Sequence, residues 1–573
     1  FLGDNLSNPI VSSFLSASNS VNNGHSICIA ADGYLYAMGF NIFGQLGNSS
    51  TVDANLPVRP LNVGMVDFLN VLDRGAPKCF TSMANQITYT SARLNAIVNA
   101  YTFNTTVSFE YGLTTSYGSE ITIPGVLTRG EDSFRTAVIA GLTPHKTYHY
   151  RVKAVNAKGT SYGEDMTFIT SAATTAYASS GEHTLVVDSN GIVYGFGRNT
   201  EGQLGDGTLI NKSLPVKVLK GAYVGTTYLG DNPANPILSV ATGEFHSLAL
   251  AADGSVYSFG YNLYGQLGDN TNVNKSLPVQ VVKGAYAGTT NLGDNLNNPI
   301  LSVLAGWGYS LALAKDGTIY SFGDNTYGQL GNGTVTGSLV PVRAIKGGYT
   351  GTTFLGDNPM NPIVKISGGV DHAMALAADG TVYSYGRNTE GQLGNGAIVN
   401  SASPIKVLKG LYPGATFLGD NLNNPITAIS AGRYHSLALA DNGRVFSFGL
   451  NTFGQLGDGT LTQQTTPVIV LKGLYAGTTN LGDNIANPIV SIASGWYHSI
   501  SLAADGSVYT FGYNVDGELG DNTNVNKTTP IRVLKGAYGG TTFLGDKLNN
   551  PIVMIGAGEG HNIATDAKGF LYT

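Results

Sequence analysis

Residues 243–268 read GEFHSLALAADGSVYSFGYNLYGQLG, and close copies of this stretch recur along the chain. The tetrapeptide Gly-Gln-Leu-Gly starts at Gly202, Gly265, Gly328, Gly391 and Gly454, and Gly-Glu-Leu-Gly starts at Gly517, and each step between these copies is 63 residues. A histidine ladder keeps the same spacing at His183, His246, Tyr309, His372, His435, His498 and His561. A long fixed period predicts stacked or radially arranged copies of one supersecondary unit.

Each repeat is predicted to contain three or four short strands. In residues 480–542, two apolar runs surround a Gly-rich corner and end at the turn Asp505-Gly506, and two further apolar runs follow. None of them shows a helical period. Short strands joined by tight turns are typical of a propeller blade, with an open solenoid as the alternative. The small residues of Ser247–Ala251 are expected on the innermost strand, where blades converge on the axis.

The repeat resembles that of the regulator of chromosome condensation family. The resemblance rests on Gly243-x-x-His246-Ser-Leu-Ala-Leu, on Asp253-Gly254-x-Val256-Tyr257-Ser-Phe-Gly260-x-Asn262 and on Gly265-Gln266-Leu267-Gly268. It covers about five-sixths of the chain and implies a seven-bladed β-propeller. A long Gly/Asn loop in each repeat, LKGAYAGTTNLGDNLNNPI in one copy, departs from the family pattern.

A foreign block interrupts the first period, because the earliest tetrapeptide starts at Gly44, 158 residues before Gly202. Residues 77–172 show alternating strands at sandwich spacing. The stretch Leu142-Thr-Pro144-His-Lys-Thr-Tyr148-x-Tyr150 resembles the core signature of a fibronectin type III domain of the bacterial surface-protein type, which implies a tyrosine corner at Tyr148.

The predicted fold class is therefore all-β, a seven-bladed β-propeller with an inserted β-sandwich. The predicted domains are a first blade at 1–76, an inserted fibronectin type III-like sandwich at 77–172, and the remaining blades at 173–573 with a surplus half-blade at the C-terminus.

Composition argues against several classes of partner. Only 12% of residues are charged, and the net charge of -6 with a pI near 5.8 disfavours nucleic acid. No run of about 18 apolar residues is present, so no membrane-spanning helix is predicted. The 77 glycines and the largely neutral polar surface favour an extracellular or cell-surface protein. Cys28 and Cys79 are expected to be separate thiols, with a disulfide as the alternative.

The histidine ladder does not predict a metal site. Equivalent positions spread around a ring cannot converge on one tetrahedral ion, and one of them is Tyr309, so a structural hydrogen bond to a neighbouring strand is expected. Each loop of two acidic ladders supplies one Asp, which predicts carboxylates that cap their own turns, with calcium binding as the alternative. These ladders are Asp231, Asp294, Asp357, Asp420, Asp483 and Asp546, and Asp206, Asp269, Asp458 and Asp521. No hydrolase, zinc-protease or phosphate-loop motif occurs, so neither an enzyme nor a cofactor is predicted.

Two positions vary between repeats while the frame stays fixed, which marks a candidate working surface. One is the pair before the histidine ladder, which holds both tryptophans, and the other lies inside the Asn-x-x-Gly-Gln loop. Aromatic loop tips are typical of protein contact surfaces, and packing between blades is the alternative. The candidate partner-binding residues are Trp307, Trp496, Tyr497, Tyr434, Phe245, Tyr264, Tyr327, Phe453 and Phe43.

The two halves of the repeat do not occur equally often. The His-bearing half occurs eight times and the Gly-Gln-Leu-Gly half seven times, so a ring of seven leaves one half over. An unpaired strand edge is a template for pairing, and a head-to-tail contact that does not close makes a filament. The sequence therefore predicts a non-catalytic extracellular structural protein that self-associates into filaments through propeller faces and the surplus half-blade. The alternative is a secreted propeller that binds another surface or secreted protein through its aromatic loop tips.

Overall fold

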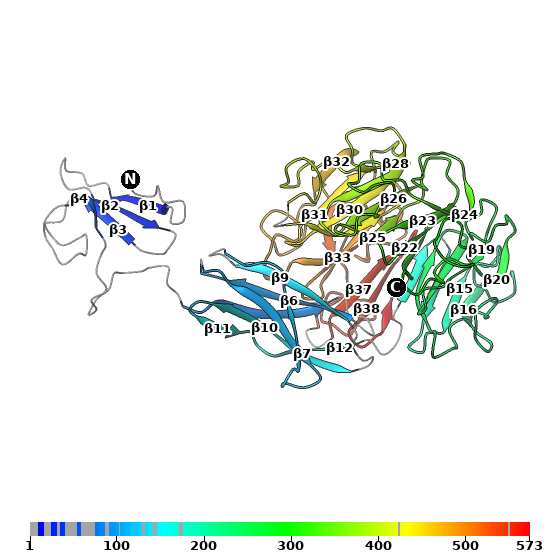
Figure 1. Cartoon of the computed structure of the whole chain (residues 1–573), viewed down its shortest axis with the longest axis horizontal. Helices are drawn as coiled ribbons and strands as arrows, with labels where there is room; N and C mark the ends of the chain where they lie inside the picture. The colour runs from blue at the N-terminus through cyan, green and yellow to red at the C-terminus, as the bar shows by residue number, and fades with distance from the viewer. Residues whose placement is uncertain are drawn as a thin grey trace. The chain divides into compact units, whose positions relative to one another are not determined.

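The computed structural model describes the backbone of residues 10–16, 25–30, 35–39, 54–58 and 75–573, apart from 86–90, 102, 129–131, 141, 143–145, 171–175, 181, 422–423 and 548–549. Side chains are described from residue 75 onward, apart from these positions and from 85, 91, 140, 169, 176–177 and 179–180. Every named element is a strand (Figure 1), which confirms the all-β prediction. Among the described residues, no helix has the length and hydropathy that crossing a membrane requires.

The chain divides into two compact units. The first comprises residues 1–82, 94–137 and 148–167, and the second comprises residues 83–93, 138–147 and 168–573. An N-terminal antiparallel sheet in the first unit has four strands in chain order, β1 (Ile10–Ser16), β2 (His25–Ala30), β3 (Leu35–Gly39) and β4 (Ala54–Val58). The assignment of residues 1–76 to a first propeller blade stays a prediction, as do the other predicted domain boundaries.

Residues 77–172 form two sheets. Their strands are β5 (Lys78–Asn85), β6 (Ser91–Asn99), β7 (Thr106–Gly112), β8 (Ser119–Thr122), β9 (Ser133–Ala140), β10 (Thr147–Asn156), β11 (Gly159–Tyr162) and β12 (Met166–Ile169). One sheet has the order β5-β6-β9, and the other has the order β11-β10-β7-β8 with β12 beside β10. Cys79 is a buried free thiol, and Cys28 lies outside the residues whose side chains are described.

The second unit consists mainly of consecutive antiparallel sheets, six with four strands and a last one with three. The first sheet comprises β13 (Ala176–Ser180), β14 (His183–Val187), β15 (Val193–Gly197) and β16 (Lys212–Lys217). The second comprises β17 (Ile237–Thr242), β18 (His246–Ala251), β19 (Val256–Gly260) and β20 (Lys275–Gln280). The third comprises β21 (Ile300–Ala305), β22 (Tyr309–Ala314), β23 (Ile319–Gly323) and β24 (Ser338–Arg343). The next two are β25 (Ile363–Gly368), β26 (His372–Ala377), β27 (Val382–Gly386) and β28 (Ser401–Lys406); and β29 (Ile426–Ala431), β30 (His435–Ala440), β31 (Val445–Gly449) and β32 (Gln464–Ile469). The last two are β33 (Ile489–Ser494), β34 (His498–Ala503), β35 (Val508–Gly512) and β36 (Lys527–Arg532); and β37 (Ile552–Ala557), β38 (Asn562–Asp566) and β39 (Leu571–Tyr572).

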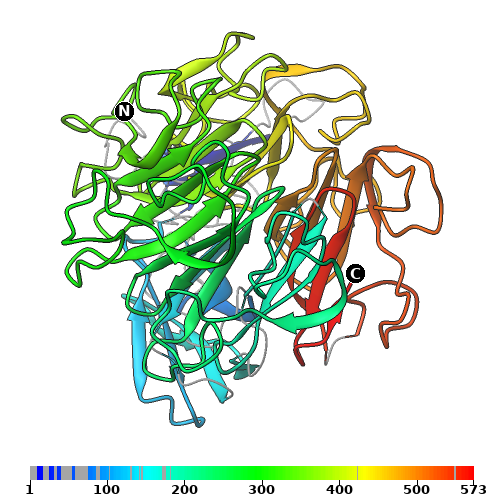
Figure 2. The same ribbon diagram turned by 90° about the vertical axis from the view of Figure 1, so that its right-hand side faces the viewer.

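These sheets are arranged around an axis. The first strand of each sheet contacts the first strand of the next, from β13 through β17, β21, β25, β29 and β33 to β37. Strand β13 also contacts β37, and Figure 2 shows the red C-terminal strands beside the teal strands of the first of these sheets. Antiparallel sheets arranged radially make a β-propeller, so the open-solenoid alternative is wrong.

The strand that lines the axis differs from the one expected. Ser247–Ala251 lies in β18, the second strand of its sheet, which is buried along its whole length. The axial cavity is lined instead by residues of the first strands, such as β17, and by glycines that follow them, such as Gly306. At the equivalent position of the second sheet, a Cβ on Gly243 would clash with the carbonyl oxygen of Gly306. The prediction that the strand with alternating Leu and Ser or Ala lies at the axis is therefore wrong. The glycines that follow the first strands, where the sheets approach closely, identify the axis instead.

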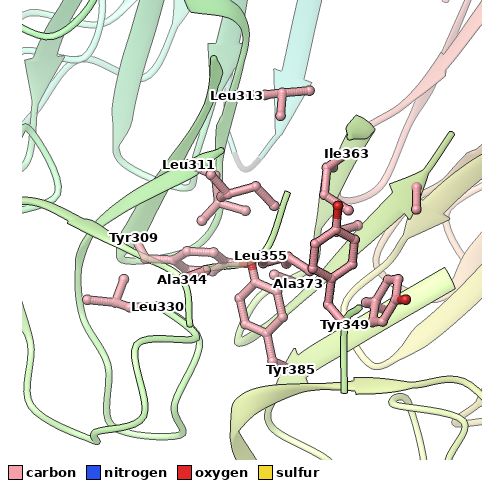
Figure 3. Close-up of a cluster of buried hydrophobic side chains, with 14 residues drawn as sticks. Tyr309, Leu311, Leu313, Leu330, Ala344, Tyr349, Leu355, Ile363, Ala373 and Tyr385 are labelled. Carbon is pink, nitrogen blue, oxygen red and sulfur yellow. The ribbon is translucent and has the colours of Figure 1, made fainter. Parts of the chain in front are cut away.

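The Leu-Ala alternation serves packing between neighbouring sheets. Leu248 and Leu250 of β18 belong to one buried cluster with Ala312 and Ala314 of the following sheet. One sheet further on, Leu311 and Leu313 pack in the same way with Ala373 and Ala375 (Figure 3). A large side chain on one face fits a small one on the facing strand, which fills the space between sheets at the density of a protein core.

The histidine ladder links neighbouring sheets by hydrogen bonds, as predicted. The Nε2 atoms of His183, His246, His372 and His435 lie 2.9, 2.9, 3.0 and 3.0 Å from the hydroxyls of Ser247, Ser310, Ser436 and Ser499, and that of His498 lies 3.0 Å from Oδ1 of Asn562. The Ser247 hydroxyl donates to the carbonyl oxygen of Gln203 at 2.8 Å, so His183 Nε2–H must donate to Ser247. Burial lowers the pKa of His183, His246, His372 and His435 to about 3 and that of His498 to about 4.

One boundary uses different chemistry. Tyr309 replaces the histidine, and Ala373 replaces the serine that would accept its hydrogen bond. The Tyr309 hydroxyl instead donates to the carbonyl oxygen of His372 at 2.6 Å, with the carbonyl oxygen of Gly369 at 3.1 Å. The paired change keeps the boundary satisfied, which supports a structural role for the whole ladder.

The acidic ladder caps its own loops, as predicted. Asp294 accepts hydrogen bonds from the backbone N–H groups of Thr289, Thr290 and Asn291 and from the Thr289 hydroxyl, at 2.7 to 3.0 Å. Partial burial works to raise the pKa of Asp294, but these hydrogen bonds outweigh it and lower the pKa to about 2. In the part of the chain that the structure describes, no three His, Cys, Asp or Glu side chains are grouped to hold a metal ion.

Candidate binding site

The two varied positions lie at the same end of their sheets. In the second sheet of the second unit, residues 243–245 join β17 to β18, and residues 261–274 join β19 to β20. In an antiparallel meander the first and third connections leave from one end. We call this end the aromatic face, and its predicted members are Phe245, Tyr264, Trp307, Tyr327, Tyr434, Phe453, Trp496 and Tyr497. Phe43 lies outside the described residues.

Aromatic rings from neighbouring sheets touch on this face. Tyr264 lies 5.6 Å from Trp307 of the next sheet, and Phe453 lies 5.2 Å from Tyr497 of the next sheet, between ring centroids. All eight predicted members that the structure describes are half-buried. The rings therefore do pack between sheets, and each keeps part of its surface in solvent.

A third varied position, which sequence reasoning missed, completes the aromatic face. It is the residue between the glycine that ends the third strand and the following asparagine, and it is Arg198, Tyr261, Asp324, Arg387, Leu450 or Tyr513. The guanidinium of Arg198 lies 4.6 Å from the ring centre of Phe245, and that of Arg387 lies 4.3 Å from Tyr434. The signal was present, since this position also varies at the 63-residue period.

An axial cavity of about 330 Å³ lies at the centre of the second unit. All of its consecutive sheets contribute to the lining, which is mostly Gly, Ala, Ser, Thr and Val. The largest side chains are first members of the varied pairs, namely Glu244, Trp307, Arg433, Trp496 and Glu559, and Val370 holds the equivalent position in the fourth sheet. Since those pairs lie in loops of the aromatic face, that face borders the cavity, and its size is at the lower end of the range for ligand pockets, about 300–1,000 Å³.

The cavity holds charges of both signs. Arg433 lies 4.1 Å from the ring centre of Trp496, 5.2 Å from that of Tyr434 and 5.5 Å from that of Tyr497. Burial raises the pKa of Glu244, and burial together with the field of Glu244 raises the pKa of Glu559 to about 7. The carboxyl groups therefore hold their protons more tightly than exposed glutamates do.

Two other arginines of the aromatic face form ion pairs. Glu182 Oε2 lies 2.6 Å from Arg198 Nη1, and Asp371 Oδ2 lies 3.6 Å from Arg387 Nη1. Burial is the main cause that raises the pKa of Asp371 to about 6, although Arg387 opposes it. Each of these arginines is thus held by a carboxylate and by an aromatic ring, whereas Arg433 forms no ion pair with a carboxylate of the described residues.

Comparison with known proteins agrees with this fold. A family model described as the RCC1-like domain matches residues 226–573, more than half of the chain. The chain belongs to the RCC1-like domain family. A second model, described as the regulator of chromosome condensation (RCC1) repeat, matches residues 32–67 and 190–250.

Individual relatives match parts of the chain. The ultraviolet-B receptor UVR8 of Arabidopsis thaliana is 30% identical over 290 residues, which cover 50% of this chain and 56% of the receptor. The probable E3 ubiquitin-protein ligase HERC4 of Homo sapiens is 32% identical over 240 residues, which cover 42% of this chain and 20% of the ligase. The chain thus spans little more than half of the first relative and a fifth of the second.

Solved structures share the propeller fold. Human WBSCR16 superposes with a TM-score of 0.55 at 22% identity, covering 72% of this chain and 92% of that protein. Yeast RCC1 (Prp20), solved with Kap60 bound, superposes with a TM-score of 0.51 at 20% identity, covering 69% of this chain and 80% of that one. At these identities the likeness supports the fold alone.

Proposed function

We propose that this chain is a non-catalytic binding protein whose aromatic face holds another protein. The observation that supports this most directly is the grouping of half-buried aromatic rings and arginines around the axial cavity. Trp, Tyr and Arg contribute most of the binding energy at protein interfaces, and rings held by neighbouring sheets lose little side-chain freedom on binding. Solved structures of the same fold offer a precedent, since yeast Prp20 has been solved with Kap60 bound and is described as binding Gsp1p and histones.

The test compares variants at the two ends of the sheets. Tyr327→Ser with Phe453→Ser removes apolar surface from the aromatic face, and Leu296→Ser with Leu474→Ser removes it from the loops at the opposite end. Leu296 and Leu474 are 79% and 64% exposed, so the control pair is not expected to disturb the fold. A partner captured by the wild-type chain is purified, and its affinity for each variant is measured by calorimetry.

The expected result is a loss of at least about tenfold in affinity for the aromatic-face variant and none for the control, because interface rings are typical hot spots. Circular dichroism verifies that both variants are folded. Equal affinity of the partner for the wild type and the aromatic-face variant would contradict the proposal.

We also propose the finer architecture that the sequence predicts. Seven blades are supported by the contact of β13 with β37, with β37–β39 as the last blade. The surplus sheet is then the N-terminal β1–β4 sheet rather than a C-terminal half. A fibronectin type III-like sandwich at 77–172 is supported by its strand order, with the first, second and fifth strands in one sheet and the others in a second sheet. An experimental density map of the whole chain tests both proposals.

Self-association is a second candidate function. It is supported by the count of sheets, since the chain has one four-stranded sheet more than the ring of the second unit uses. Sedimentation velocity across a wide range of concentration tests it, and a strictly monomeric protein would refute both the oligomer and the filament. The extracellular or cell-surface location stays a prediction, which cell fractionation of the source organism tests.

A further inference from the structure

The axial cavity has an excess of negative groups. Glu244, Glu559 and Arg433 are the only ionisable side chains among its described lining residues. Arg433 lies over Trp496 and near Tyr434 and Tyr497, so aromatic rings already stabilise its charge. The Glu559 side chain forms neither an ion pair nor a hydrogen bond with any described residue. Glu559 is half-buried, and a partly desolvated carboxylate without a hydrogen bond or ion pair is less stable than a solvated one, so a bound cation would offset that cost.

The two carboxylates come from the two sheets that flank the first sheet of this unit. Glu244 follows β17 in the second sheet of this unit, and Glu559 follows β37 in the last, while β13 of the first sheet contacts both strands. Arg433 follows β29, three sheets after Glu244 and two sheets before Glu559. Around the ring Glu559 thus lies two sheets from Glu244 and two sheets from Arg433. The field of Arg433 opposes the rise in pKa of both carboxyl groups, and a single arginine facing two carboxyl groups leaves one acidic group in excess.

The two tryptophans differ in what they contact. The ring of Trp496 carries the guanidinium of Arg433, whereas Trp307 carries no cation of the described residues on its ring. Trp307 contacts Tyr264, and Trp307 and Glu244 both line the cavity, where Trp307 favours the charged form of the Glu244 carboxylate. An aromatic face beside a carboxylate is the usual recognition element for an organic cation.

From these contacts we infer that the axial cavity binds the cationic side chain of a lysine or arginine from a partner protein, with Glu244 and Glu559 as counter-ions and Trp307 as the aromatic wall. The inference rests on the proposed function, because it names the group that a protein on the aromatic face would insert. A volume of about 330 Å³ has room for an ammonium or guanidinium group and the methylenes next to it.

The experiment uses the intrinsic fluorescence of the full chain. The chain has two tryptophans, and both line the cavity, so their emission reports this site and no other part of the protein. The probe is lysine capped at both termini, titrated at constant ionic strength against the wild-type chain. The matched neutral probe is the same molecule with its side-chain amine acetylated. We expect a saturable change in emission in the millimolar range with the charged probe and none with the neutral one.

Isosteric variants test the counter-ions. Glu244→Gln with Glu559→Gln should weaken the charged probe at least tenfold, and Glu164→Gln, an exposed position in the first unit, should leave it unchanged. If the double variant does not fold by circular dichroism, Glu559→Gln alone serves, with at least a threefold loss expected. Equal binding of the neutral probe, equal binding by the folded variant, or no saturable change with the wild type would overturn the inference.

Two further results distinguish the cation site from its assignment to a partner side chain and from the proposed function. A five-residue glycine peptide with a central lysine should bind at least as tightly as n-butylammonium, and exclusion of the peptide while n-butylammonium binds would overturn the assignment to a partner side chain. If the capped lysine binds but the aromatic-face variant keeps full affinity for its protein partner, the proposed function fails and the cation site stands. If the partner assay succeeds and the capped lysine does not bind, only the cation site fails.

Discussion

Lowering the pH from 7 to 5 is expected to destabilise the second unit, because five of its histidines are buried in the neutral form. In the folded chain the pKa of His183, His246, His372 and His435 is about 3 and that of His498 about 4, against 6.5 for an ordinary histidine. Below pH 6.5 the unfolded chain takes up protons at these positions and the folded chain does not. The stability that they contribute is therefore complete above pH 6.5 and falls with pH down to the folded pKa.

The size of this loss of stability follows from how far pH 5 lies below the pKa of a histidine in the unfolded chain. At pH 5 the unfolded histidines are 1.5 units below their pKa, and one unit corresponds to about 1.36 kcal/mol, so each contributes about 2 kcal/mol and all five about 10 kcal/mol. Glu559, Glu244 and Asp371 act in the opposite direction, because their folded pKa values are raised and protonation relieves them. A typical domain has about 5–15 kcal/mol of total stability, so the net change should be large enough to approach unfolding.

A single substitution isolates the cause. In His246→Gln the side-chain amide keeps a donor toward Ser310 but does not titrate. The free energy of unfolding is measured by guanidinium titration, with circular dichroism as the signal, for wild type and variant at pH 7 and pH 5. The variant should lose about 2 kcal/mol less than the wild type between the two pH values. An equal loss in both proteins, within about 0.5 kcal/mol, would refute the assignment of neutral buried histidines.

Three further substitutions are expected to change the free energy of unfolding, measured by the same titration at pH 7. In Tyr309→His the new imidazole faces Ala373 and its N–H is left unpaired, which should cost about 1–3 kcal/mol. Adding Ala373→Ser supplies an acceptor and should recover most of that cost. A double variant no more stable than the single one would contradict the pairing of residues 309 and 373 across the two sheets. Asp294→Ala removes the acceptor of four loop hydrogen bonds and should cost about 1–2 kcal/mol, whereas no change would mean that water replaces the carboxylate fully. Leu311→Ala empties a fully buried position between two sheets and should cost about 2–5 kcal/mol; a cost below about 1 kcal/mol would show that the two sheets move together to close the space.

Periodicity predicted the propeller because every repeat carries its own turns and strands. The turn Asp253-Gly254 and the apolar run from Val256 to Phe259 predict a hairpin without any knowledge of the rest of the chain. Local patterns did not identify the strand on the axis, since small residues are needed both at the axis and between sheets. Ser247–Ala251 meets the second need and Gly243 the first.

The chemistry of the cavity was only partly predictable. Variation between repeats marked the pair before the histidine ladder, and both tryptophans of that pair do line the cavity. The variation between repeats did not reveal that Glu244 and Glu559, which are five periods apart, line one cavity with Arg433. Their proximity follows from the closure of the sheets around the axis. The paired exchange at Tyr309 and Ala373 was visible at a separation of 64 residues and is the clearest unused signal of contact between neighbouring sheets.

The boundary between Tyr309 and Ala373 also bears on how nearly identical modules find their places. Modules with interchangeable edges can dock in the wrong sequence while the chain folds, a characteristic failure of tandem arrays. A histidine edge presented to Ala373 would lack its acceptor, and Tyr309 presented to a serine edge would meet a hydroxyl where its ring needs room. The Asn562 edge, which accepts from His498, is distinct again. Because these contacts between sheets differ from the others, they disfavour incorrect docking orders of the modules that the identical contacts would allow.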